Sequence, residues 1–175
     1  MKKFIAILAL CTLCLTASAQ FMNSRQSQSQ SSMTHKTGFR AFLLGGYTLG
    51  DKDGDRAELL ASFGGQINDY LFVGGGAGGN YYTDEDFATI PIFANVRGYI
   101  PVKSRVRPFV DLKTGYGIST GSDYNGGFYV NATTGIEISH FTVGIGYSSQ
   151  TLSVDGYDDY SFSTGGFTLN LGFAF

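Results

Sequence analysis

The chain has 175 residues and a formal net charge of −2, and glycine, tyrosine and phenylalanine supply 25, 11 and 15 of its residues. Helical bundles and coiled coils are rich in Ala, Glu, Lys and Leu, so this composition excludes them. The near-neutral charge removes the basic surface that nucleic-acid binding requires, and the length argues for one folded domain.

Residues 1–19 have the layout of a cleavable signal peptide. Lys2 and Lys3 form a basic start, residues 4–15 are apolar, and residues 17–19 read Ala-Ser-Ala, a small-residue cleavage site. We therefore expect an exported protein whose mature chain begins after this segment.

The sequence after the cleavage site changes in character before the fold begins. Both cysteines, Cys11 and Cys14, precede it, so we expect no disulfide, thiolate metal site or thiol nucleophile in the mature chain. Residues 20–37 are rich in Ser and Gln, which is typical of a disordered tail. No later run approaches the ~20 apolar residues that a membrane-spanning helix needs. Residues 38–175 therefore carry the fold.

Beyond the tail, apolar residues recur at every second position, which is the period of a β-strand. The last strand shows this most clearly, since Phe167, Leu169, Leu171, Phe173 and Phe175 alternate with small or polar residues. The pattern predicts eight strands. They cover residues 39–49, 56–67, 70–82, 87–100, 108–120, 127–138, 141–152 and 161–175.

The connections between these strands alternate between two kinds. Those after the first, third, fifth and seventh strands are acidic or turn-rich and hold ten of the fourteen acidic residues. Those after the second and sixth are the dipeptides 68–69 and 139–140, of hairpin length, and residues 101–107 carry three basic side chains. The two ends of the structure therefore differ electrostatically.

The two faces of the predicted strands differ in size and polarity. One face is bulky and apolar, and so much bulk could not fit inside a closed eight-stranded barrel. The other face is rich in Gly, Ser, Thr and Ala and carries mid-strand charges that sum to zero. These are Arg40, Glu58, Arg97, Asp111, Lys113 and Glu137. Small residues inside and large ones outside predict an all-β fold, an eight-stranded antiparallel up-and-down transmembrane β-barrel.

Aromatic residues near both ends of the strands support this interpretation, because membrane interfaces select two aromatic girdles. One predicted girdle comprises Phe39, Tyr70, Tyr99, Phe109, Phe141 and Phe173, and the other Tyr47, Tyr81, Phe87, Phe128, Tyr147 and Phe162.

The six charged residues share one narrow lumen, where an unpaired charge is costly. We expect them to form ion pairs that close the lumen, with Arg97 and Asp111 on adjacent antiparallel strands as the central pair. Eight strands enclose an interior that side chains just fill, so no water pore is expected.

Four segments resemble the small outer-membrane β-barrel (porin) family, which includes opacity-protein-like and OmpA- and OmpX-type eight-stranded barrels. They are residues 107–117 (RPFVDLKTGYG), 134–138 (TGIEI), 141–147 (FTVGIGY) and 169–175 (LNLGFAF). The resemblance covers residues 38–175. It implies a bacterial outer-membrane protein with short turns and tail in the periplasm and the acidic loops outside. It also implies that Phe173 and Phe175 form the signal that the barrel assembly machinery reads.

The acidic loops are the candidate surface-binding region of such a barrel. Beside lipopolysaccharide phosphates they suggest bridging divalent cations, while the simpler interpretation is that they stay solvated. The candidate residues are Asp51, Asp53, Asp55, Asp84, Glu85, Asp86, Tyr124, Tyr157, Asp158, Asp159 and Tyr160.

No catalytic, cofactor or metal site is predicted. Residues 51–55 lack the spacing of a calcium-binding EF-hand, and residues 74–79 contain G-x-G-x-x-G without the helix that a dinucleotide needs. Acyl-transferring barrels of the family place a histidine at the external leaflet, whereas here His35 lies in the tail and His140 in a predicted turn. We expect a monomeric, non-enzymatic barrel with a structural or surface-interaction role. An adhesin or host-binding barrel and a soluble secreted barrel with a lipophilic ligand stay open as alternatives.

Overall fold

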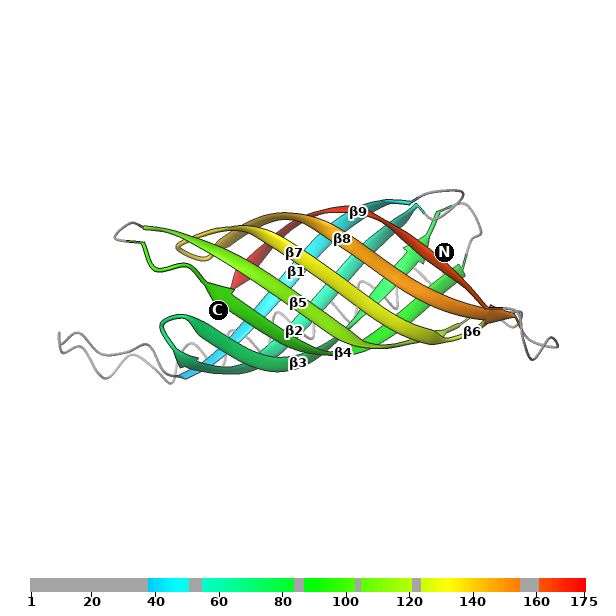
Figure 1. The fold of residues 1–175 in the computed structure, drawn as a ribbon, viewed down its shortest axis with the longest axis horizontal. Coiled ribbons are helices and arrows are strands. Elements are labelled where there is room, and N and C mark those ends of the chain that lie inside the picture. Colours follow the sequence, from blue (N-terminus) through cyan, green and yellow to red (C-terminus); the bar gives the residue numbers. More distant parts are fainter. Residues whose placement is uncertain (1–37, 51–54, 84–86, 103–104, 121–123, 155–160) are drawn as a thin grey trace, which may run out of the picture. The chain divides into compact units, whose positions relative to one another are not determined.

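The computed structural model describes residues 38–50, 55–83, 87–102, 105–120, 124–154 and 161–175, and within them eight long strands form one antiparallel barrel (Figure 1). The predicted all-β, eight-stranded fold is confirmed, and every predicted strand end lies within two residues of the observed one. The long strands are β1 (Gly38–Gly50), β2 (Arg56–Asn68), β3 (Leu71–Tyr82), β4 (Phe87–Tyr99), β5 (Val106–Ser119), β7 (Gly127–Ile138), β8 (Phe141–Val154) and β9 (Ser161–Ala174). A two-residue strand, β6 (Tyr124–Asn125), pairs with the end of β8.

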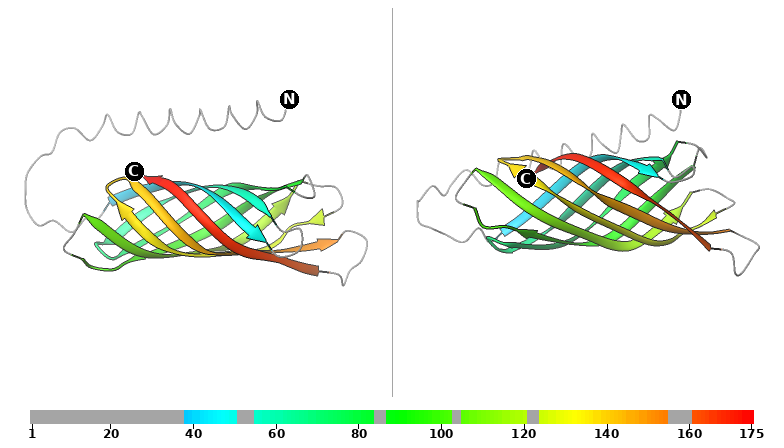
Figure 2. Two further views of the ribbon diagram at one scale, coloured as in Figure 1. Left: turned by 90° about the horizontal axis from the view of Figure 1, so that it is seen from above. Right: turned by 45° about the horizontal axis from the view of Figure 1, so that its top comes forward.

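The sheet closes on itself because the last strand pairs with the first. The β1–β9 ladder runs from Phe42↔Ala174 to Gly50↔Gly166, and β9 also pairs with β8. Figure 2 shows the resulting closed wall from two sides. Closure satisfies the backbone groups of the strands without an exposed sheet edge, which a membrane-spanning sheet requires.

The barrel has two distinct ends. At the turn end, β2–β3, β4–β5 and β7–β8 are joined, and Ser139 of the last hairpin has a left-handed backbone with φ of 58°. At the loop end, the connections after β1, β3, β5 and β8 emerge. There β8 and β9 stay paired as far as Ser153↔Ser161, beyond the last β1–β9 pair. The β8–β9 hairpin therefore projects past its neighbour β1.

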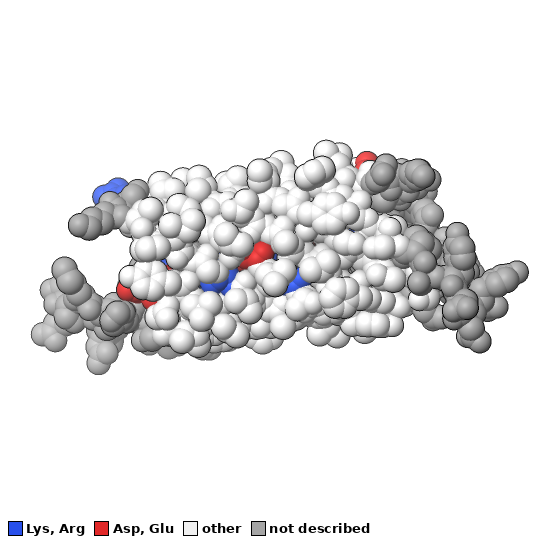
Figure 3. All heavy atoms as spheres, viewed as in Figure 1, with Lys and Arg blue, Asp and Glu red and all other residues white. Residues whose placement is uncertain are grey.

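The outer wall is apolar and almost without charge. Large hydrophobic side chains cover it on every long strand, and Phe167, at 76% exposure, is the most open. Figure 3 shows one side of this wall, with only a few charged atoms visible between the uncharged ones. Among the described residues, no helix is long and apolar enough to cross a membrane.

The predicted aromatic girdles are partly wrong. Phe39, Tyr70, Phe141, Phe173, Tyr47, Tyr81, Phe128 and Tyr147 lie exposed on the outside. Tyr99, Phe109 and Phe87 instead point inward and are buried, and the Phe162 side chain lies outside the described residues. A position near the end of a strand does not show whether a side chain points into the barrel or out of it. Neighbouring residues point to opposite sides, and either of them can be aromatic.

The expectation of a lumen lined by small residues is also only partly right. Three clusters of bulky side chains fill it from the turn end to the loop end. They are Phe42, Phe72, Tyr99 and Phe109 with Ala174; Leu44, Leu60, Phe93 and Tyr129; and Tyr82, Phe87 and Leu152. Inward-facing glycines make the room, since a Cβ added at Gly76 would lie 2.9 Å from the Phe93 ring. Large and small residues thus alternate inside the barrel, as tight packing of a small interior requires.

Candidate functional site

The lumen gathers the polar and charged side chains of the barrel. All six charged residues singled out from the sequence face it, and all but Arg40 are buried. Five of them lie toward the turn end, while Glu58 belongs to a separate group toward the loop end. The lumen is therefore the candidate functional site, and it has two polar groups.

Glu137 of β7 is the centre of the turn-end group. Its Oε1 accepts hydrogen bonds from Arg40 Nη2 at 2.8 Å and Arg107 Nη1 at 3.3 Å. Its Oε2 accepts one from the Tyr99 hydroxyl at 2.9 Å and lies 3.8 Å from Arg97 Nη1. We call these five residues the mouth cluster. Arg107 and Glu137 are direct ladder partners across β5 and β7, which explains why they meet.

Asp111 of β5 is the centre of a second set of polar contacts in the turn-end half of the lumen. Arg97, its ladder partner on β4, donates Nε to Oδ2 at 2.5 Å. Lys113 donates to Oδ1, as does Asn95 Nδ2 at 3.0 Å. The structure therefore brings together the pair that the sequence favoured as central, and adds two further donors to the same carboxylate.

Arg97 is also held by aromatic rings. Its guanidinium lies 4.0 Å from the Phe42 ring centroid and 4.3 Å from that of Phe109. Guanidinium groups stack well on aromatic faces because they are planar and weakly hydrated. A buried cation therefore lies against two rings in the turn-end half of the lumen.

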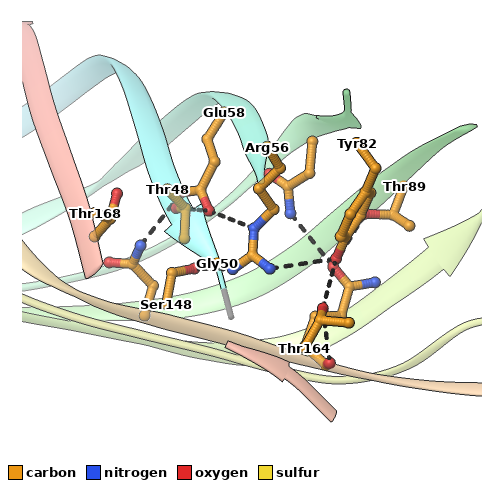
Figure 4. A network of polar contacts seen from close by, with 12 residues as sticks. Thr48, Gly50, Arg56, Glu58, Tyr82, Thr89, Ser148, Thr164 and Thr168 are labelled. Carbon is orange, nitrogen blue, oxygen red and sulfur yellow. Dashed lines mark hydrogen bonds and ion pairs between the residues drawn. The ribbon is translucent and has the colours of Figure 1, made fainter. Parts of the chain in front are cut away.

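Glu58 and Arg56 form the loop-end group (Figure 4). Arg56 donates Nε to Glu58 Oε1 at 2.8 Å and Nη2 to the Ser148 hydroxyl at 2.6 Å, and its Nη1 lies 3.3 Å from the Tyr82 hydroxyl. Thr48 also donates to Glu58 Oε1 at 2.8 Å. These contacts tie β1, β2, β3 and β8 together across the lumen.

Sequence reasoning missed Arg56 and Arg107. Arg56 has the same strand parity as Glu58, and Arg107 the same parity as Asp111, so the two-residue period could have placed both inside. When Arg56 and Arg107 are included, the described lumen residues carry five positive and three negative charges. The expected zero net charge of the lumen is therefore wrong. Arg56 is the first residue of β2 and Arg107 was expected in a turn, so neither counted as a mid-strand charge.

The comparisons with known proteins agree with this geometry at the level of the fold. No family model matches the chain, and no curated protein matches it. The crystal structure of Neisserial surface protein A aligns with a TM-score of 0.57 and 16% identity, over 78% of this chain and 94% of that one. The chain has the fold of the small eight-stranded outer-membrane barrels.

Two further outer-membrane barrels, both from Pseudomonas aeruginosa, align more loosely. The N-terminal barrel domain of OprF gives a TM-score of 0.46 at 14% identity, over 78% of this chain and 96% of that one. OprG gives 0.46 at 12% identity, over 83% and 99%.

Other candidate residues of this outer-membrane-type barrel are placed only in part. Phe173 and Phe175 lie exposed on the outer wall at the turn end, and Phe173 packs on Phe141 with ring centroids 4.6 Å apart. Asp55 accepts hydrogen bonds from the Gly50 amide and the Tyr47 hydroxyl. The side chains of the remaining loop candidates lie outside the described residues. They are Asp51, Asp53, Asp84, Glu85, Asp86, Tyr124, Tyr157, Asp158, Asp159 and Tyr160.

No metal-ligating arrangement is present in the part of the chain that the structure describes, where no group of three His, Cys, Asp or Glu side chains converges. What the lumen can do chemically follows from its ion pairs and packed rings. These side chains fill much of the lumen and pair with one another across it.

Proposed function

We propose that this chain is a small, monomeric, non-enzymatic outer-membrane barrel with a closed, charge-plugged lumen and a structural or surface-interaction role. The observation that carries the proposal is the alternation of three bulky clusters with two ion-pair groups along the lumen. Bulky and charged side chains that pack closely against one another leave little space for a hydrated ion.

The outer wall favours membrane residence over the soluble-barrel alternative. A soluble barrel turns its large apolar side chains inward, whereas here they are exposed on every long strand. The non-enzymatic role is supported by His140, which is solvent-exposed in a turn beside Ser139, at the opposite end from the long loops. Export through the signal peptide at residues 1–19 and recognition by the barrel assembly machinery complete this proposal.

The surface-interaction role is supported by the projecting β8–β9 hairpin. Beyond Tyr147 and Phe167 its outward residues become polar, and the hydroxyls of Ser149 and Ser163 lie 2.9 Å apart. This change from aromatic to hydroxyl side chains is typical of a strand leaving the membrane. The hairpin would present residues 155–160 to the exterior, where lipopolysaccharide, divalent cations or a host surface are the candidate partners. An adhesin is the more specific form of the same role.

Planar-bilayer recording tests the closed lumen. We expect the purified, folded protein to give no steady conductance. Folding is checked by heat-modifiability, the change in gel mobility that a folded barrel shows when it is boiled. The double variant Arg97→Ser, Phe109→Ala removes the middle of the turn-end plug and should admit ions. The control is Val110→Ala, on the outer face of β5, the strand that carries Phe109, and its lumen should stay closed. A large steady conductance in the parent protein would contradict the proposal.

Cell fractionation tests the location, and loop replacement tests the surface role. We expect the chain in the outer-membrane fraction, and its recovery from the soluble periplasm or medium would contradict membrane residence. Replacing residues 155–159 with Gly and Ser should leave heat-modifiability intact, because exposed connections tolerate change. The same replacement should reduce any binding of whole cells to lipopolysaccharide aggregates or host cells. Unchanged binding would remove this loop from the proposal.

A further inference from the structure

The turn-end mouth of the lumen holds more cations than carboxylates. Arg40, Arg97 and Arg107 share Glu137, while Arg97 also shares Asp111 with Lys113. Four cations therefore face two carboxylates. Among the described residues of the neighbouring turns, Arg105 and Asp69 add one charge of each sign, so the excess of two positive charges persists there.

These cations lie close together around shared rings. The guanidiniums of Arg40 and Arg97 lie 5.0 and 4.0 Å from the Phe42 centroid, and those of Arg40 and Arg107 lie 5.6 and 4.0 Å from the Tyr99 centroid. Two cations that share one ring repel each other, the more so where solvent is excluded. The arrangement is therefore stabilised by any anion that can reach it.

The hydrogen-bond donors of the mouth cluster are also incompletely used. Arg97 Nη1 is fully buried and makes no hydrogen bond. Among the described residues, Arg40 donates hydrogen bonds from three of its five N–H groups and Arg107 from two of its five. Donors thus exceed acceptors at the mouth, just as cations exceed carboxylates.

Two of the arginines can be reached from solvent. The side chains of Arg40 and Arg107 are 17% and 26% exposed, whereas that of Arg97 is 1% exposed. Both approach Glu137 Oε1, at 2.8 and 3.3 Å, so their guanidiniums meet at this carboxylate oxygen and their remaining N–H groups lie close to it. A pair of converging guanidiniums is suited to oxoanions, since its planar donor forks match their oxygen atoms.

We propose that the turn-end mouth of the barrel binds a phosphate group beside Glu137, on the N–H groups of Arg40 and Arg107 that this carboxylate leaves free, with Arg97 adding favourable charge from below. The phosphate can be a free inorganic ion or the headgroup of an anionic phospholipid at the adjacent membrane interface. The inference of a phosphate site rests on the folded barrel alone, and its headgroup form also rests on the proposed membrane location.

Phosphorus-31 NMR of inorganic phosphate, titrated with the folded protein in uncharged detergent micelles at constant ionic strength, tests the proposal. We expect saturable broadening. Arg107→Gln and, separately, Arg40→Gln should weaken the apparent affinity by about tenfold, the typical effect of one charged hydrogen bond. Arg105→Gln, in the exposed turn nearby, is the matched control and should bind like the parent. The folded fraction is checked by heat-modifiability, so a variant that folds poorly is not mistaken for one that binds poorly.

A second titration with phosphatidylglycerol added to the micelles distinguishes the two sources. Competition by the lipid identifies a headgroup site, and unchanged phosphate binding identifies a site for the free ion. The proposal is overturned if broadening does not saturate, if the ion binds adventitiously with no loss in either lumen variant, or if Arg105→Gln weakens binding as much as Arg107→Gln.

Discussion

At the scale of single residues, two of the lumen carboxylates, Asp111 and Glu137, each pair with more than one cation. Asp111 accepts hydrogen bonds from Arg97, Lys113 and Asn95. Removing Asp111 leaves Lys113 without a counter-ion and leaves Arg97 with only Glu137, at 3.8 Å, while removing one cation leaves the carboxylate still paired. The carboxylates are therefore expected to be less replaceable than the cations.

Asp111→Asn should lower the free energy of unfolding by roughly 3–5 kcal/mol, the usual effect of breaking a buried ion pair from one side. Lys113→Met should cost less, because Arg97 still pairs with Asp111. Urea unfolding of the detergent-folded protein, followed by the heat-modifiable gel shift, measures both. Equal losses in the two variants would show that Asp111 does not serve both cations.

Ser139 holds a backbone conformation that glycine adopts more readily. Its φ of 58° places it in the left-handed region, in the two-residue turn between β7 and β8. Ser139→Gly should therefore raise the free energy of unfolding by about 1 kcal/mol. Ser149→Gly, in the extended backbone of β8, is the control and should lower it by roughly 0.5–1 kcal/mol. A loss of stability in Ser139→Gly would contradict the strain argument.

At the scale of strands, the glycines of β3 have opposite roles on the two faces. A Cβ at Gly76 would meet the Ala61 carbonyl oxygen, lie 2.8 Å from Ser62 Cα and 2.9 Å from the Phe93 ring, whereas one at Gly79 would meet nothing within 4 Å. Gly76→Ala should cost about 1–3 kcal/mol through overpacking. Gly79→Ala should be neutral or slightly stabilising. Parallel urea titrations test this, and equal costs would mean that β3 can shift to absorb the extra carbon.

The strand pattern also explains what the sequence could and could not predict. A two-residue period locates strands and groups residues by face, so the strand ends and the inward charges followed directly. The period alone cannot show which face of a strand points into the barrel when both faces carry large side chains. In β4, Phe87, Phe93 and Tyr99 point inward while Ile90 and Ile92 point outward. The packing of a ring over a glycine on a neighbouring strand is a three-dimensional property that no single strand encodes.

At the scale of the whole molecule, insertion can be separated from stability. If Phe175 is the signal for the assembly machinery, Phe175→Asp should lower the outer-membrane level far more than Phe167→Asp. Both side chains lie on the outer wall, and Phe167 is the more exposed. An acidic residue there costs stability because it faces lipid. A larger loss at Phe175 would therefore report recognition, and equal membrane levels would count against the signal.

The seam between β1 and β9 has a consequence for the timing of folding. Phe42 pairs with Ala174, so the first strand of the barrel waits for the last one. Contacts between residues so distant in sequence form slowly, because loop-closure entropy is lost before they are made. Until the final strand has joined the sheet, both sheet edges stay unpaired and open to aggregation. A chain that ends before residue 161 would therefore keep both edges open, and we expect it to aggregate rather than to close a barrel.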